Sequence, residues 1–273
     1  MVELERPVMK RPKLGQHFLV DKNIARKIVD SASLTKKDTV IEIGPGKGVL
    51  TELILPKVKK LICIEIDGTL VAYLKRKFAG YRNLKIIPAD FLSWKPPKTI
   101  LKKSVPIKFI SNLPYYITTP IIKKIFNYKN WSTAVLTVQK EVGERMLAEP
   151  DTKNYGALTL FVKYFCNAEK VAGITSKCFY PEPKVDSIIL KLGRIKTRGS
   201  RKFYESFSRI VNSAFKYRRK TVVNSLNRAL GLDKTLIRGV LSGSGIDPSL
   251  RAENISFEKY INLTSSFKEY LPG

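Results

Sequence analysis

The segment VIEIGPGKGVLT places three glycines, Gly44, Gly46 and Gly48, between an apolar run and a helical pattern. Glycines in such a turn allow backbone conformations, and a close approach of a ligand to the backbone, that a Cβ atom would forbid. A phosphate-binding P-loop is excluded, because its lysine must be followed by Ser or Thr and Lys47 is followed by glycine. The spacing also differs from the GxGxxG fingerprint of dinucleotide-binding proteins. The segment is therefore either a binding turn of another kind or a purely structural tight turn.

Two carboxylates follow, at the ends of the next two apolar runs. Glu65 in ICIEID can accept hydrogen bonds from both ribose hydroxyls of a nucleoside bound beside the glycine turn. Asp90 in IIPADFL can accept one from the exocyclic amine of adenine. Each also has a simpler interpretation, Glu65 as a helix cap and Asp90 as the first residue of a loop. Asp67 is predicted to be the N-cap of the following helix.

The segment ISNLPYYITTP follows the fourth apolar run. Thr119 can cap the next helix with Pro120 at its first position, so residues 112–116 form a loop between a strand end and a helix. NLPY is similar to the (D/N)PPY-type motif of methyltransferases that act on exocyclic amines, and this similarity suggests the N6 amine of adenine as the target. That amine is a poor nucleophile, because its lone pair is delocalised into the ring. An Asn112 side-chain oxygen and a backbone carbonyl that accept its two hydrogens would favour a pyramidal nitrogen. Tyr115 would stack on a base turned out of its helix. The alternative is an Asn-Pro-Tyr type of turn without a substrate.

These motifs carry a family resemblance. The pattern ExGxGxG resembles motif I of class I S-adenosylmethionine (SAM) methyltransferases, and NLPY carries the similarity already described. Together with RPKLGQHFLVDKNIARKIV, residues 11–29, and CFYPEPKVDSIILKL, residues 178–192, they make the chain resemble the KsgA-type ribosomal RNA adenine dimethyltransferase family over essentially its whole length. The resemblance implies SAM as the cofactor. It also implies N6,N6-dimethylation of two adjacent adenosines in a hairpin loop near the 3′ end of small-subunit rRNA, within a ribosomal particle of the pre-30S type.

The resemblance also implies roles for single residues. The cofactor-binding positions are His17, Leu19, Gly44, Gly46, Glu65, Asp90 and Asn112. The catalytic positions are Asn112, Leu113, Pro114, Tyr115 and Phe179, the last of which packs on the other face of the target base. The alternative for Phe179 is a core aromatic at the approach to a strand. His17 stands where many relatives have Asn, and no general base is needed, because an N6-methylated adenine loses its extra proton to solvent.

Two rival functions remain. The first is an Erm-type methyltransferase of large-subunit rRNA, whose motifs are similar; NLPYY and the basic segment 193–228 favour the small subunit. The second is a ribosome-assembly or transcription factor of the same fold that binds nucleic acid without catalysis. The intact NLPY and the carboxylates at the strand ends argue against a loss of activity.

The elements that must position these residues form an alternating pattern. Short runs rich in Ile and Val alternate with amphipathic stretches, which is typical of βα units and a parallel sheet. This predicts an α/β fold with a Rossmann-like class I SAM-methyltransferase sheet of seven strands, at residues 39–44, 61–67, 84–90, 107–113, 133–139, 168–174 and 185–192. Helices are predicted at 49–57, 68–79, 118–127, 140–149 and 155–166, whereas residues 91–106 are too rich in proline. The last strand is predicted to be antiparallel, because residues 178–184 are too few for a parallel crossover.

The pattern changes at Gly193, where the basic segment GRIKTRGSRK begins. Beyond it, apolar residues recur at helical spacing between Phe203 and Phe215, and further helices are predicted at 219–230, 233–242 and 256–270. We therefore divide the chain into a catalytic domain, residues 1–195, and a smaller helical domain, residues 196–273.

Charge points to a polyanionic partner. Lys and Arg number 50 against 23 Asp and Glu, a net charge of +27, which is typical of proteins that bind nucleic acid. Residues 191–228 hold 12 of the basic residues and a single acidic one, Glu205. The residues predicted to contact rRNA phosphates are Lys216, Arg218, Arg219 and Lys220. The alternative is a merely solvated basic helix face.

Composition excludes other classes. A hydrophobic content of 44% in 273 residues rules out wholesale disorder. One histidine and three widely spaced cysteines cannot assemble a zinc site, so no metal is expected. No apolar stretch approaches the length of a membrane span. We expect a cytoplasmic monomer that binds small-subunit rRNA and no membrane.

Overall fold

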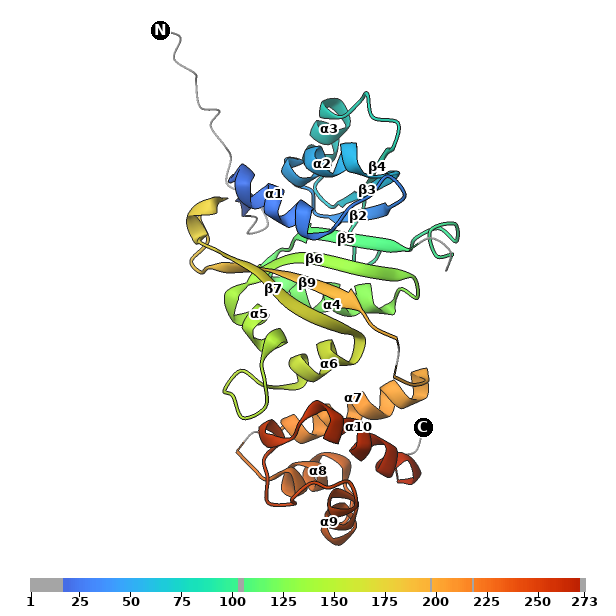
Figure 1. Cartoon of the computed structure of the whole chain (residues 1–273), viewed down its shortest axis with the longest axis vertical. Coiled ribbons are helices and arrows are strands. Elements are labelled where there is room, and N and C mark those ends of the chain that lie inside the picture. Colours follow the sequence, from blue (N-terminus) through green and yellow to red (C-terminus); the bar gives the residue numbers. More distant parts are fainter. Residues whose placement is uncertain (1–16, 103–105, 197, 218, 271–273) are drawn as a thin grey trace.

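The fold is built around a seven-stranded sheet (Figure 1), seen in a computed structural model that describes residues 17–102, 106–196, 198–217 and 219–270. The strand order is β4 (Leu84–Pro88), β3 (Lys60–Glu65), β2 (Thr39–Ile43), β5 (Ile107–Asn112), β6 (Trp131–Gln139), β9 (Ser187–Arg194) and β7 (Cys166–Ile174). The first five are parallel to one another, and β9 is antiparallel to both of its neighbours. The predicted α/β fold, its seven strands and the antiparallel last strand are confirmed.

Six helices cover the two faces of this sheet. Side chains alternate along each strand, so Val40 and Leu61 face one side while Ile41 and Ile62 face the other. The first side packs against α1 (Lys22–Ser31), α2 (Val49–Ile54) and α3 (Gly68–Lys77). The second packs against α4 (Thr118–Asn127), α5 (Lys140–Leu147) and α6 (Ala157–Phe165). Asp67 is the N-cap of α3 as predicted, because its side chain accepts from the backbone amides of Thr69 and Leu70.

α4 has the predicted bounds, residues 118–127, but not the predicted cap. The helix begins at Thr118, without Thr119 as its cap, and a 3₁₀ turn (Tyr115–Ile117) runs directly into it. The hydroxyl of Thr118 donates to the carbonyl of Pro114 at 3.3 Å. Because the turn continues into the helix, no extended capping residue is needed. Pro120 stands third in the helix, where an N–H group would have no partner within the helix.

A two-stranded antiparallel ribbon stands beside the main sheet. It joins β1 (Phe18–Leu19) to β8 (Phe179–Tyr180), with Phe18 opposite Tyr180 and Leu19 opposite Phe179. The sequence patterns did not predict it. Strands of two residues are too short to show any periodicity, so only the tertiary structure reveals them.

Four helices, α7 (Arg201–Phe215), α8 (Val222–Leu230), α9 (Lys234–Gly243) and α10 (Phe257–Ser266), form the C-terminal end of the molecule (Figure 1). Their apolar core also takes in Tyr155, Leu160 and Tyr164 from the segment that includes α6. The boundary at residues 195/196 therefore remains a prediction. Gly231 ends α8 in the left-handed conformation, with φ +73°. No helix in the described part of the chain is long and apolar enough to cross a membrane.

Candidate active site

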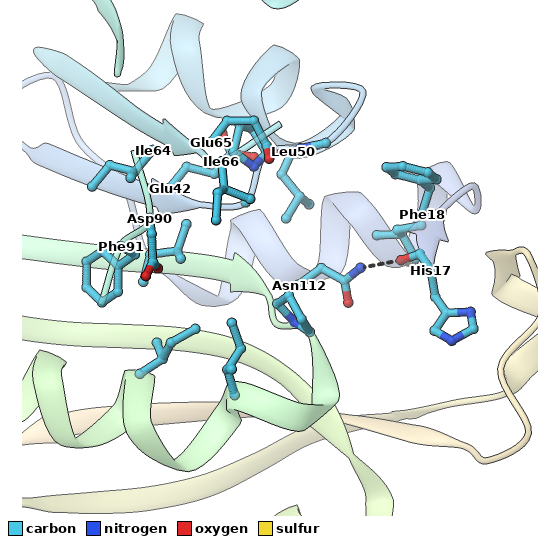
Figure 2. Close-up of a pocket in the computed structure, with 18 of the residues that line it drawn as sticks. His17, Phe18, Glu42, Leu50, Ile64, Glu65, Ile66, Asp90, Phe91 and Asn112 are labelled. Carbon is cyan, nitrogen blue, oxygen red and sulfur yellow. Dashed lines mark hydrogen bonds between the residues drawn. The ribbon is translucent and has the colours of Figure 1, made fainter. Parts of the chain in front are cut away.

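A pocket opens at the carboxyl ends of β2, β3, β4 and β5 (Figure 2). From β2 the chain moves outward to β3 and β4 and then returns to the other side of β2 as β5. Ligands of open α/β sheets bind at such a reversal of strand order. The pocket lining includes every residue predicted to bind the cofactor, namely His17, Leu19, Gly44, Gly46, Glu65, Asp90 and Asn112.

The glycine turn between β2 and α2 forms one wall. Gly44, Gly46 and Gly48 all have positive φ, at +63°, +57° and +77°, where side chains are strained. A Cβ atom at Gly48 would come within 2.7 Å of the Phe78 ring, so this glycine serves the packing of α3. A Cβ atom at Gly44 would meet no protein atom within 4 Å. Gly44 therefore leaves free space inside the pocket, which a ligand can approach closely.

Glu65 stands at the end of β3 with its carboxylate turned back to the glycine turn. Its Oε2 accepts from the amide of Gly46 at 3.1 Å and its Oε1 from the amide of Asp67 at 3.0 Å. Burial raises the pKa of Glu65, and the two backbone donors oppose that rise. Each oxygen keeps a further lone pair, so the carboxylate can also accept from a pair of hydroxyls.

Asp90 and two apolar neighbours shape the next part of the pocket. Asp90 follows β4, and its Oδ1 accepts from the amide of Leu92 at 2.9 Å. Ile66 and Phe91, which directly follow Glu65 and Asp90 in the sequence, also line the pocket. Ile66 is 58% exposed. Sequence reasoning missed these two residues. Their positions directly after the two carboxylates could have indicated that they line the same pocket and offer apolar surfaces to a flat ring.

Asn112 is fixed by the N-terminal segment. Its Nδ2 donates to the backbone carbonyl of His17 at 3.0 Å (Figure 2). Among the described residues, Oδ1 of Asn112 has no hydrogen-bond donor, so it is free to accept from a substrate. Leu113 contributes differently, because its side chain is buried in the core while its amide donates to Thr137. The carbonyl of Leu113 likewise has no donor within the described structure, whereas that of Pro114 accepts from Ile117 and Thr118.

The two tyrosines of NLPYY have different surroundings. Tyr115 is half-buried and lies outside the pocket lining. Its hydroxyl is 2.7 Å from Oγ of Ser187, and its ring stacks on that of His17 with the centroids 5.7 Å apart. Tyr116 lines the pocket and is 66% exposed. Stacking of Tyr115 on a base stays a prediction, and no role was predicted for Tyr116.

Phe179 lies in β8 and is only 3% exposed. It is absent from the pocket lining and belongs to the core cluster that includes Leu19 and Ile189. In this conformation its ring has no free face for a base. The structure therefore favours the core-aromatic alternative over the predicted contact with substrate.

Glu42 is a buried pocket residue that sequence reasoning did not single out. Its Oε2 accepts from the Thr51 hydroxyl at 2.7 Å and from the Cys63 thiol at 3.4 Å. Its Oε1 has no hydrogen-bond partner among the described residues. Burial raises the pKa of Glu42 from 4.5 to about 7. Glu42 is the acidic residue of the ExGxGxG pattern, and this position could have identified it as a pocket residue from the sequence.

The predicted RNA-binding cluster lies in the connection between α7 and α8 and outside the pocket lining. Lys216, Arg219 and Lys220 are exposed, and Arg218 falls outside the described residues. The prediction that a helix begins at residue 219 is wrong, because α8 begins at Val222 with Thr221 as its cap. The Nζ atom of Lys216 lies 5.7 Å from the centroid of the Tyr217 ring. A turn can aim its basic side chains in more directions than one helix face can.

Comparison with known proteins gives a consistent result. The family model described as "Ribosomal RNA adenine dimethylase" matches residues 8–269. "Ribosomal RNA small subunit methyltransferase A" of Clostridium botulinum (strain Loch Maree / Type A3) is 40% identical over 260 residues, 94% of each chain. The protein of that name from Alkaliphilus metalliredigens is 41% identical, over 92% of this chain and 89% of its own.

Two solved structures extend the comparison. A dimethyladenosine transferase from Plasmodium falciparum superposes with a TM-score of 0.79 at 30% identity, over 93% of this chain and 98% of its own. The 23S rRNA methyltransferase ErmE superposes with a TM-score of 0.72 at 26% identity, over 92% of this chain and 99% of its own.

Proposed function

Because the chain belongs to the ribosomal RNA adenine dimethylase family, we propose that it dimethylates N6 of two adjacent adenosines in the 3′-terminal hairpin loop of small-subunit rRNA. It is a SAM-dependent rRNA adenine dimethyltransferase. The small subunit is favoured by the relatives from Clostridium botulinum and Alkaliphilus metalliredigens, whose names specify it. We propose a pre-30S type of particle as the substrate, with the exposed Lys216, Arg219 and Lys220 contacting rRNA phosphates.

The pocket suits SAM in its shape and in its hydrogen-bonding groups. Glu65 offers carboxylate lone pairs for the two ribose hydroxyls, and Asp90 offers its carboxylate to the adenine amine. Ile66 and Phe91 supply apolar faces beside them. The space at Gly44 lets the methionine part of the cofactor lie against the backbone. SAM supplies an electrophilic methyl group on a sulfonium centre.

The chain's own contribution to the reaction is to hold and orient the target amine. Asn112 Oδ1 and the Leu113 carbonyl are two neighbouring acceptors without donors among the described residues. Together they can accept the two hydrogens of adenine N6. This arrangement turns the nitrogen lone pair away from the ring and toward the cofactor side of the pocket. Preorganised acceptors of this kind need no rearrangement during the reaction. Such preorganisation is the largest source of rate enhancement in many enzymes.

The observation that carries the proposal is the position of Asn112 in the lining of the same pocket as Gly44, Glu65 and Asp90. A hydrogen-bond acceptor for the substrate amine thus lies beside the groups proposed to bind the nucleoside part of SAM. No Ser, Cys or His nucleophile is required, because the methyl group passes directly to nitrogen and the product proton leaves to solvent.

Labelled SAM and unmethylated ribosomal subunits provide the test. The protein is incubated with small or large subunits, and the label is mapped by primer extension and mass spectrometry. Label in small-subunit N6,N6-dimethyladenosine supports the proposal. Label in the large subunit would replace it with the activity named for ErmE. Binding of either subunit without transfer would leave a non-catalytic assembly role.

A further inference from the structure

Tyr116 is the most exposed large apolar side chain at the active-site pocket. It is 66% exposed, and it lines the pocket together with Asn112 and Pro114. Among the described residues its side chain has no hydrogen bond and no ring contact. The ring therefore adds little to the packing of the protein, and it is available to a ligand at this pocket.

The local backbone forces the two adjacent tyrosines apart. Both belong to the 3₁₀ turn Tyr115–Ile117, in which successive side chains point about 120° apart. Tyr115 is held by its hydroxyl contact to Ser187 and by its stack on His17. With Tyr115 fixed toward the protein, Tyr116 is turned away from it and toward the pocket mouth. Its position is therefore set by contacts that it does not make itself.

Tyr116 lines the pocket but is 66% exposed, so most of its side chain faces solvent rather than the space beside Asn112. The base must bring N6 to Asn112 Oδ1, which lies at the end of β5. A nucleotide drawn into such a pocket leaves its neighbours in the strand outside, each without one of its stacking partners. A flat aromatic surface at the rim can replace that partner, and such stacking accepts any base.

We propose that Tyr116 stacks on the nucleotide next to the target adenine while the target occupies the pocket. This inference rests on the proposed function, because it requires an RNA substrate. In a pair of adjacent adenosines the neighbouring base is a purine, which offers a large face for stacking.

The test uses the full-length protein and unmethylated small subunits. Base–aromatic stacking is worth about 1–3 kcal/mol, so Tyr116→Ala should lower kcat/KM for the subunit by about 5- to 150-fold. Tyr116→Phe keeps the ring and should stay close to the unaltered protein. Tyr81→Ala is the matched control, because Tyr81 is also an exposed tyrosine, 46% accessible, but lies outside the pocket lining. SAM affinity, measured by calorimetry, should be the same in all four proteins.

A second readout reports stacking directly. Subunits reconstituted with 2-aminopurine beside one target adenosine fluoresce less when that base stacks on a tyrosine. Binding of the unaltered protein and of Tyr116→Phe should quench this fluorescence, and Tyr116→Ala should not.

Three results would overturn the inference. Full activity of Tyr116→Ala makes the ring a bystander. A loss of SAM affinity that accounts for the loss of rate makes it a cofactor contact. A loss in Tyr116→Phe as large as in Tyr116→Ala shifts the role to the hydroxyl. If the unaltered protein fails to methylate small subunits at all, the proposed function fails instead.

Discussion

The side-chain nitrogen of Asn112 donates a 3.0 Å hydrogen bond to the backbone carbonyl of His17, a residue 95 positions earlier in the chain. This contact decides which end of the amide faces the pocket. With nitrogen engaged by His17, oxygen is the atom presented to a substrate amine. The N-terminal segment therefore sets the orientation of the Asn112 amide as well as forming one wall of the pocket.

Replacement of Asn112 should separate chemistry from binding. Asn112→Ala removes one preorganised acceptor and should lower single-turnover methylation of small subunits by about 100-fold or more, with a much smaller change in SAM affinity. His17→Asn retains the backbone carbonyl that holds Asn112, so its effect on turnover should be far smaller. Equal losses of turnover and SAM affinity in Asn112→Ala would make Asn112 chiefly a cofactor ligand.

Two glycines with similar positive φ values offer a matched pair. Gly44 and Gly231 have φ of +63° and +73°, and a Cβ atom at either would meet no heavy atom within 4 Å. Alanine at either position should therefore cost about 1–2 kcal/mol of stability from backbone strain. Only Gly44→Ala fills space inside the pocket, so only this variant should also weaken SAM binding in calorimetry. Normal SAM affinity in a folded Gly44→Ala protein would contradict the close approach of the ligand at this turn.

Glu42 should make stability depend on pH. Its pKa is raised from 4.5 to about 7 by burial, so between these values the folded protein holds a proton that the unfolded chain has released. Stability should therefore fall as pH rises through this window, by a total on the order of 3 kcal/mol. Glu42→Gln cannot ionise and should lack this loss. Urea unfolding at pH 4 and pH 8 should show the two proteins converging at the lower pH and Glu42→Gln more stable at the higher one; identical pH profiles would show that Glu42 ionises as freely as in the unfolded chain.

Phe179 allows packing to be separated from substrate contact. Phe179→Ala should destabilise the protein by about 3–5 kcal/mol, the usual cost of emptying a buried aromatic site. Phe179→Leu should retain most of the stability and, if the residue serves only the core, most of the methylation rate. A stable Phe179→Leu protein with a severely reduced rate would restore the predicted stacking on the target base.

The α7–α8 connection should contribute to salt-dependent binding of the ribosomal particle. Lys216→Ala, Arg219→Ala and Lys220→Ala each remove one cation. Each should make the negative slope of log K against log salt shallower by about 0.7 to 0.9 if that cation neutralises a phosphate. Lys59→Ala combined with Lys60→Ala removes charge from the start of β3, at the edge of the sheet opposite the pocket, and should leave the slope unchanged. If the slope of log K against log salt is the same for both sets of variants, the RNA must be held mainly by other basic surfaces.

Local sequence patterns were sufficient for the sheet but not for everything around it. The runs that became β2 and β3 were recognisable because central parallel strands are buried on both faces and are apolar throughout. The carboxylates and Asn112 were recognisable because parallel strands bring their carboxyl ends to one edge. The pairing of Phe18 with Tyr180 was not, because two residues show no periodicity and their partner lies far along the chain.

The sequence also could not predict how deeply individual side chains are buried or in which direction they point. An aromatic residue type is compatible with a core and with a binding surface, so Phe179 and Tyr116 could be distinguished only by their exposed fractions. The KYRRK segment looked helical in composition, whereas the packing of α7 against α8 requires a turn at that point.

The β1–β8 ribbon also constrains the order of events during synthesis of the protein. Nδ1 of His17 lies 2.7 Å from the carbonyl of Pro181, 164 residues later, and β1 has no pairing partner other than β8 among the described strands. Before residues 179–181 have been synthesised, the glycine turn, both carboxylates and the Asn112–His17 hydrogen bond can already form, but Phe18 and Leu19 lack their strand partner and His17 lacks its contact to Pro181. The N-terminal wall of the pocket therefore gains its last contacts only after Pro181 has left the exit tunnel, when the catalytic sheet is nearly complete.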